Sequence, residues 1–207
     1  IHIADLHLGA KPDAGNAYSQ NREQELWDSF RDIITICNQK KTDLLLIAGD
    51  LFHRQPLIRE LREINYIFEQ VPEIQVVIVA GNHDFLSVAS NYRTFSFAKN
   101  VVFLKKNEVE SVYFPELNTE VYGMSYWHRE ETSDVYEHIT PKRQDAINIL
   151  LAHGGDAKHI PFSPAKSIEN GFDYIAAGHI HKGGVLEGMS VNPATLDSNR
   201  KITPMRA

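Results

Sequence analysis

Five short apolar runs in this chain each end at an alanine, and a potential metal ligand follows within two residues. The ligands are Asp5 with His7, Asp50, Asn82, His153, and His179 with His181. In an open α/β sheet, side chains just past the carboxyl ends of the strands meet in one crevice. Carboxylate, amide and imidazole groups bind divalent ions, and a carboxylate can bridge two of them. The sequence therefore predicts a polynuclear metal site at one edge of a sheet.

The spacing within the motifs supports this interpretation. Asp5 and His7 are two residues apart, as are His179 and His181, so in extended backbone each pair points to one side. Each motif taken alone is equally typical of a turn or a capped strand end. Five such motifs at five strand ends favour the metal site, and they contain five of the ten histidines.

Two histidines outside the ligand set, one of them within the third motif, are candidates for catalysis. His83 follows the ligand Asn82 and is predicted to donate a proton, with Asp84 holding its other ring nitrogen. The alternative for this segment is a simple Asx turn. His53 lies just beyond Asp50. The remaining histidines are expected to be structural or at the surface, with one at the cleft rim: His2, His128, His138 and, at the rim, His159.

Apolar periodicity predicts the elements that position these residues. A helix is expected over 19–38, with Leu26, Phe30, Ile33 and Cys37 on its buried face, and another from Pro56 to Pro72. The second should bury Leu57, Leu61, Ile64 and Phe68. Buried strands are expected at 43–48, 74–80, 147–152 and 172–177, and a short helix at 164–170. Shorter alternating runs at 101–104, 109–114 and 120–127 predict a largely antiparallel second sheet.

Composition sets the class of protein. A chain of 207 residues, 43% hydrophobic and 23% charged, suits one domain, expected over 1–190, with 191–207 as a tail or the start of a capping region. Its first residue is not Met, so we expect further sequence upstream. The single Cys37 excludes an internal disulfide, and no apolar run reaches membrane-spanning length. We expect a cytoplasmic protein without a membrane partner.

The net charge of −6 argues mildly against a broad nucleic-acid-binding surface. Two divalent ions would add four positive charges and leave −2, with the positive charge concentrated in the crevice. A phosphate-bearing substrate therefore remains compatible with the overall acidity.

Taken in order, the five motifs resemble those of the calcineurin-like metallophosphoesterase superfamily, over residues 1 to about 182. The run Gly49-Asp50-Leu51-Phe52-His53 and the helix around 22–38 resemble the SbcD-type DNA repair exonucleases of that superfamily. The resemblance implies an α/β (α+β) fold of two facing mixed β-sheets flanked by helices. It also implies two divalent ions, manganese first, with iron or zinc as alternatives because the donor set suits several metals.

The resemblance also assigns roles. One ion would be bound by Asp5, His7, His181 and the shared Asp50, and the other by Asp50, Asn82, His153 and His179. His83 would be the general acid for the leaving 3′ oxygen, and His53 would position or stabilise the phosphate.

The implied function is a DNA exonuclease or endonuclease that contacts the phosphate backbone. An ATPase partner bound through a C-terminal region and a homodimer would accompany it. One alternative keeps the chemistry but takes small nucleotides or other phosphoesters. Another is a binding scaffold that lost turnover, which the presence of all seven ligands and His83 disfavours.

Overall fold

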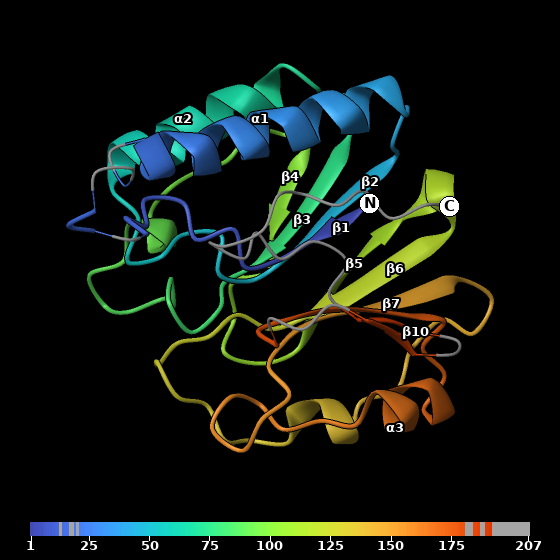
Figure 1. Ribbon diagram of the computed structural model, residues 1–207. Coiled ribbons are helices and arrows are strands. Elements are labelled where there is room, and N and C mark those ends of the chain that lie inside the picture. Colours follow the sequence, from blue (N-terminus) through green and yellow to red (C-terminus); the bar gives the residue numbers. More distant parts are fainter. Residues whose placement is uncertain (13, 17–18, 20, 181–183, 187–188, 192–207) are drawn as a thin grey trace.

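Two β-sheets face each other in the centre of the molecule, and helices cover both outer faces (Figure 1). This computed structural model describes residues 1–12, 14–16, 19, 21–180, 184–186 and 189–191. The predicted architecture of two facing sheets flanked by helices is confirmed, although only the second sheet is mixed in its described strands. Among the described residues, none of the helices has both the length and the apolar content that a membrane span requires.

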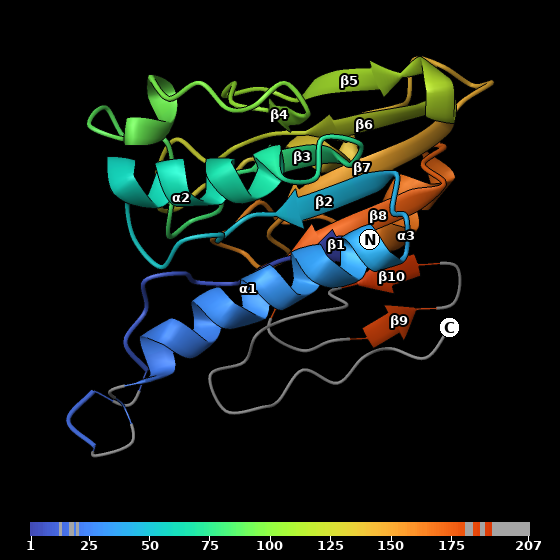
Figure 2. The same ribbon diagram turned by 90° about the horizontal axis from the view of Figure 1, so that it is seen from above.

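The first sheet is entirely parallel, in the order β1-β2-β3-β4. Its central strands are apolar except for Gln75, because helices cover one face and the second sheet covers the other. Figure 2 shows the two long helices lying side by side over this sheet. The elements are β1 (His2–Ile3), α1 (Arg22–Gln39), β2 (Leu44–Ala48), α2 (Ile58–Glu69), β3 (Gln75–Val79) and β4 (Val101–Phe103).

The two long helices follow the predicted apolar stripes. In α1, the predicted residues Leu26, Phe30, Ile33 and Cys37 are all buried. In α2, Leu61, Ile64 and Phe68 are buried, but the prediction for Leu57 is wrong, because its side chain is 41% exposed. Leu57 has extended backbone and precedes the first helical turn, so it does not share the helix's buried face.

The second sheet has the order β5-β6-β7-β8-β10-β9. The expectation of a largely antiparallel middle section is wrong. Only β5 and β6 pair antiparallel there, whereas β6, β7 and β8 are parallel and β4 joins the first sheet. The elements are β5 (Glu110–Phe114), β6 (Thr119–Gly123), β7 (Ile147–His153), α3 (Pro164–Glu169), β8 (Tyr174–Gly178), β9 (Gly184–Leu186) and β10 (Met189–Val191). The short helices are η2 (Asn91–Arg93), η3 (Pro115–Leu117) and η4 (Val135–Glu137).

Apolar residues from both sheets form the central core. His2 adds a polar link across it, since its Nε2 donates to the Ala177 carbonyl at 3.2 Å and its Nδ1 accepts from the Tyr174 hydroxyl at 3.1 Å. These hydrogen bonds connect β1 of the first sheet to β8 of the second. The ligand-bearing strand ends of both sheets come together at the same end of the molecule.

Candidate metal centre

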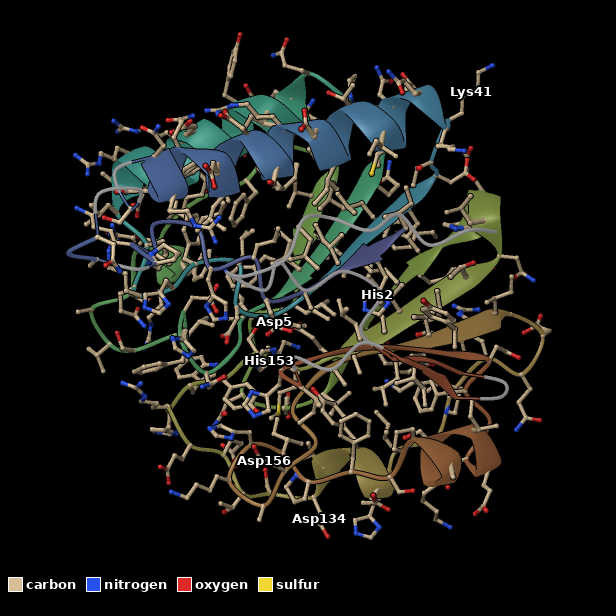
Figure 3. The ribbon with its side chains drawn as sticks, in the orientation of Figure 1. His2, Asp5, Lys41, Asp134, His153 and Asp156 are labelled. Atoms are coloured by element: carbon tan, nitrogen blue, oxygen red, sulfur yellow. The ribbon has the colours of Figure 1, made fainter. Side chains whose placement is uncertain are left out.

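Three buried side chains from three strand ends form the centre of the site. Asp5, Asp50 and His153 are each at most 1% exposed, and one potential ligand atom from each lies within 4.8 Å of the others. Asp5 follows β1, Asp50 follows β2, and His153 ends β7 in the other sheet. Figure 3 shows Asp5 and His153 close together where the two sheets meet. The predicted convergence of these three motifs is therefore observed.

Acceptor atoms converge on one point between these residues. The Nδ1 of His153 donates to the Ala48 carbonyl at 2.8 Å, which leaves Nε2 facing the crevice. This Nε2 lies 2.9 Å from Asn82 Oδ1 and 3.5 Å from Asp50 Oδ2. Two oxygen acceptors therefore face this nitrogen, and either a proton on Nε2 or a cation bound between the three groups would satisfy them.

The electrostatics of the crevice also favour a bound cation. Burial alone would lower the pKa of His153, but the charges of Asp50 and Asp5 raise it to about 9. Burial alone would raise the pKa of Asp50, but the facing His153 and His7 hold this pKa below its usual range. The protein thus favours positive charge at this point, and a divalent ion would replace the His153 proton. The mixed oxygen and nitrogen donors suit manganese, iron or zinc.

His7 lies beside this group, with its Nε2 3.8 Å from Asp50 Oδ2. The backbone around the ligands is strained: φ is positive at Asp5 (53°), His7 (48°), Asp50 (50°) and His179 (89°). Non-glycine residues seldom adopt this region, and such strain gathers at functional sites. Four of the predicted ligands share it.

The glycines of the motifs allow the ligands to approach one another. A Cβ added at Gly81 would lie 2.7 Å from His153 Nε2 and 2.6 Å from the backbone nitrogen of Asp50. One added at Gly178 would lie 2.8 Å from the Ala4 Cβ and closer still to the Ala48 carbonyl oxygen. Only a residue without a side chain fits at either position.

The structure describes only part of the fifth motif, namely His179. The backbone N–H of His179 donates to both carboxylate oxygens of Asp5, at 2.9 and 3.1 Å, and its ring centroid is 5.2 Å from that of His153. Burial lowers the pKa of His179, so the ring is neutral at neutral pH. The prediction for His181 lies outside the described residues.

Two residues at the site were missed or underestimated from the sequence. Asp156 was missed, and His159 was expected only at the cleft rim. The side chain of His179 donates from Nε2 to Asp156 Oδ2 at 2.8 Å, and His159 donates to the same carboxylate. Their signal was an aspartate and a histidine three residues apart, in the polar loop that follows the strand-end ligand His153. Of the histidines expected away from the site, His128 and His138 are exposed.

Three imidazoles stand together at the open side of the centre. The ring of His7 meets His83 edge-on at 4.7 Å and His53 at 5.4 Å, and His53 and His83 stack at 5.1 Å. The backbone N–H of His83 donates to Asp50 Oδ1 at 2.9 Å, which ties this residue to the central carboxylate. Burial and the neighbouring His83 lower the pKa of His53.

The expected contact between Asp84 and the ring of His83 is wrong. Asp84 is fully buried and accepts from the backbone of Gly81 at 2.8 Å, and from the Phe52 backbone and the Tyr92 hydroxyl at 3.1 Å each. The ring of His83 instead donates from Nδ1 to the His53 carbonyl at 3.1 Å. Adjacent residues on a tight turn point apart, so Asp84 joins two motif loops while His83 faces the crevice.

With this geometry in view, comparison with known proteins identifies the family. The family model described as calcineurin-like phosphoesterase matches residues 1–183. The chain belongs to this family. Its members are hydrolases that use divalent metal ions, and the Asp and His cluster of this chain could hold such an ion.

Several relatives are 24–30% identical to this chain over the residues that align. The DNA double-strand break repair protein Mre11 of Methanocaldococcus jannaschii is 30% identical, over 88% of this chain and 51% of its own. An uncharacterized metallophosphoesterase, YhaO of Bacillus subtilis, is 29% identical over 90% and 49%. The Mre11 protein of Sulfolobus acidocaldarius is 24% identical over 87% and 49%. The chain spans about half the length of these curated relatives.

A solved crystal structure matches with a TM-score of 0.50 and 14% identity, covering 92% of this chain and 88% of its own. At this identity the likeness supports the fold alone.

Proposed function

We propose that this chain hydrolyses phosphodiester bonds in DNA, as an exonuclease or endonuclease, with two divalent ions. The observation that carries the proposal is the convergence of buried acceptor atoms from Asp50, Asn82 and His153, with three imidazoles beside them. Such a group of side chains suits a phosphate held between metal ions and a proton donor.

In this proposal, both ions share Asp50, and manganese is the metal we favour. The ligands would be Asp5, His7, Asp50 and His181 for one ion, and Asp50, Asn82, His153 and His179 for the other. When bound, two such ions would lower the pKa of a water and screen the charge of the phosphate oxygens.

His83 would supply the proton for the leaving group. Its Nδ1 donates to the His53 carbonyl, so Nε2 is the nitrogen that can deliver a proton into the crevice. As a water oxygen bonds to phosphorus and releases a proton to solvent, the bond to the leaving 3′ oxygen breaks. That oxygen would take the Nε2 proton of a doubly protonated His83 ring, which becomes neutral. His53, whose pKa is lowered, would be neutral and could donate a hydrogen bond to a phosphate oxygen.

DNA is favoured as the substrate by two observations. Several relatives carry the name DNA double-strand break repair protein. In addition, the Arg93 guanidinium lies 4.5 Å from the centre of the Trp127 ring. Trp127 is two residues from Ser125, whose hydroxyl accepts from the backbone of Ala80 beside the third motif. An arginine on an aromatic ring can stack a base and contact a phosphate, and the segment that carries Trp127 is hydrogen-bonded to the strand end before the third motif.

An ATPase partner and a homodimer belong to this proposal as well. The chain itself spans about half the length of its curated relatives. The runner-up is the hydrolysis of small nucleotides or other phosphoesters. The net charge of −6 favours it, because a long polyanion is repelled by an acidic surface.

A direct comparison of substrates tests the proposal. Purified protein with Mn²⁺ is given linear DNA, end-labelled on either strand end, and in parallel bis(p-nitrophenyl) phosphate. We expect both to be cleaved, with DNA cleaved at far lower substrate concentration. Cleavage of the small ester alone would favour the runner-up, and cleavage of neither would contradict both.

A further inference from the structure

Asp156 lies between two imidazoles at the rim of the metal centre. Its Oδ2 accepts from His179 Nε2 at 2.8 Å, and its carboxylate also accepts from His159 Nδ1, at 2.9 Å to Oδ1. The two rings are 4.2 Å apart. Figure 3 shows Asp156 below the level of Asp5 and His153. Among the described residues, its hydrogen bond to His179 links it to the centre.

The loop after β7 fixes the position of this carboxylate. Asp156 Oδ1 accepts from the backbone N–H of Lys158 at 2.8 Å and of His159 at 3.1 Å. The N–H of Gly155 donates to the His159 carbonyl at 2.9 Å, and a bridge between His159 and Glu131 joins the loop to the rest of the molecule. The buried Ile160 follows. The carboxylate is thus placed before any ion binds.

An ionised carboxylate can only accept hydrogen bonds, and a neutral imidazole carries a single N–H. Since Asp156 faces Nε2 of His179, that nitrogen must carry the proton. The lone pair is then at Nδ1, which becomes the one ring nitrogen able to bind a metal. A partner of this kind fixes the tautomer and orientation of a metal-binding histidine and makes it a stronger ligand.

We propose that Asp156 is a positioning residue of the metal centre, which holds His179 in the Nε2–H tautomer and aims its Nδ1 at the ion. His159 steadies the carboxylate from the other side. The inference rests on the proposed function, because it gives His179 its role as a ligand.

Asp156→Asn is the decisive variant. The asparagine oxygen can still accept from the Lys158 and His159 backbone, so the loop is retained. Its NH₂ group, however, replaces the oxygen that faces His179 and can only donate. His179 Nε2 must then accept, and its proton moves to Nδ1, where it opposes metal binding.

Two measurements report on this change. Long-range ¹H–¹⁵N NMR of the metal-free protein reads the tautomer of His179, which should change from Nε2–H to Nδ1–H. Calorimetric titration with Mn²⁺ reads affinity, and we expect one of the two ions to bind about 10- to 100-fold more weakly. The matched control is Asp134→Asn, which changes the exposed Asp134–His138 pair at 3.2 Å and should alter neither result.

Unchanged tautomer and affinities in Asp156→Asn would overturn the inference while leaving the proposed function intact. A third ion in the wild type that this variant loses would also overturn it, because Asp156 would then be a ligand itself. Failure of the wild type to bind any Mn²⁺ would instead overturn the proposed function, and the inference with it.

Discussion

Gly81→Ala tests how tightly the ligands are packed. The added methyl carbon would lie 2.6 Å from the backbone nitrogen of Asp50, 2.7 Å from His153 Nε2, and closer still to Asp50 Oδ1. Ordinary contact begins at 3.4 Å, so the neighbours must retreat by about 1 Å. Two of these three atoms belong to the predicted ligand groups themselves.

The expected cost follows from that displacement. A misplacement of about 1 Å at a catalytic centre can lower the rate about 100-fold. Overpacking a dense interior also costs roughly 1–3 kcal/mol of unfolding free energy. We therefore expect kcat/KM for bis(p-nitrophenyl) phosphate to fall at least about 100-fold. The affinity for Mn²⁺ should fall as well.

Gly171→Ala is the matched control. Gly171 has a φ of +104°, so alanine is strained there, but the added carbon would lie 3.6 Å from Pro141, its nearest neighbour. This variant should lose about 1–2 kcal/mol of stability without any change at the metal centre. Urea unfolding measures the stability of both variants, and titration with Mn²⁺ measures the site. If Gly81→Ala kept wild-type metal affinity and turnover, the close packing inferred around Asp50 would be refuted.

Three other variants test separate residues. His83→Gln should keep both ions but slow phosphodiester hydrolysis about 100- to 10,000-fold, because the proton donor is lost; unchanged turnover would rule out that role. Asp50→Ala should abolish binding of both ions in a Mn²⁺ titration, and two intact sites would contradict the shared carboxylate. Burial lowers the pKa of His2 from 6.5 to about 4, so the unfolded chain takes up this proton first. Stability should therefore fall by roughly 3 kcal/mol as the pH drops through that window. His2→Gln should remove this part of the pH dependence in urea unfolding, and an unaltered slope would show that other groups cause it.

The sequence alone determined the strand ends and the residue types placed there. Apolar runs that stop before a polar residue are a local signal, and the geometry of parallel strands converts that signal into a shared edge. The helix stripe of Leu26, Phe30, Ile33 and Cys37 was predicted for the same reason, since helical periodicity needs no knowledge of distant residues.

Tertiary structure decided which groups touch. The strand at Val101–Phe103 is too short for its pattern to specify a partner, and it pairs in parallel with β3. Asp84 was assigned to the ring of its neighbour His83, but the turn sends the two side chains to different partners. Side-chain hydrogen bonds depend on how loops from distant parts of the chain approach.

Asp156 shows the same limit most clearly. Its loop places it beside His179, 23 residues further along the chain. No spacing rule predicts that contact, because it arises only when β7 and β8 pair and their following loops meet. The sequence therefore determined the chemistry available at the sheet edge, while the packing of loops determined which carboxylate orients which imidazole.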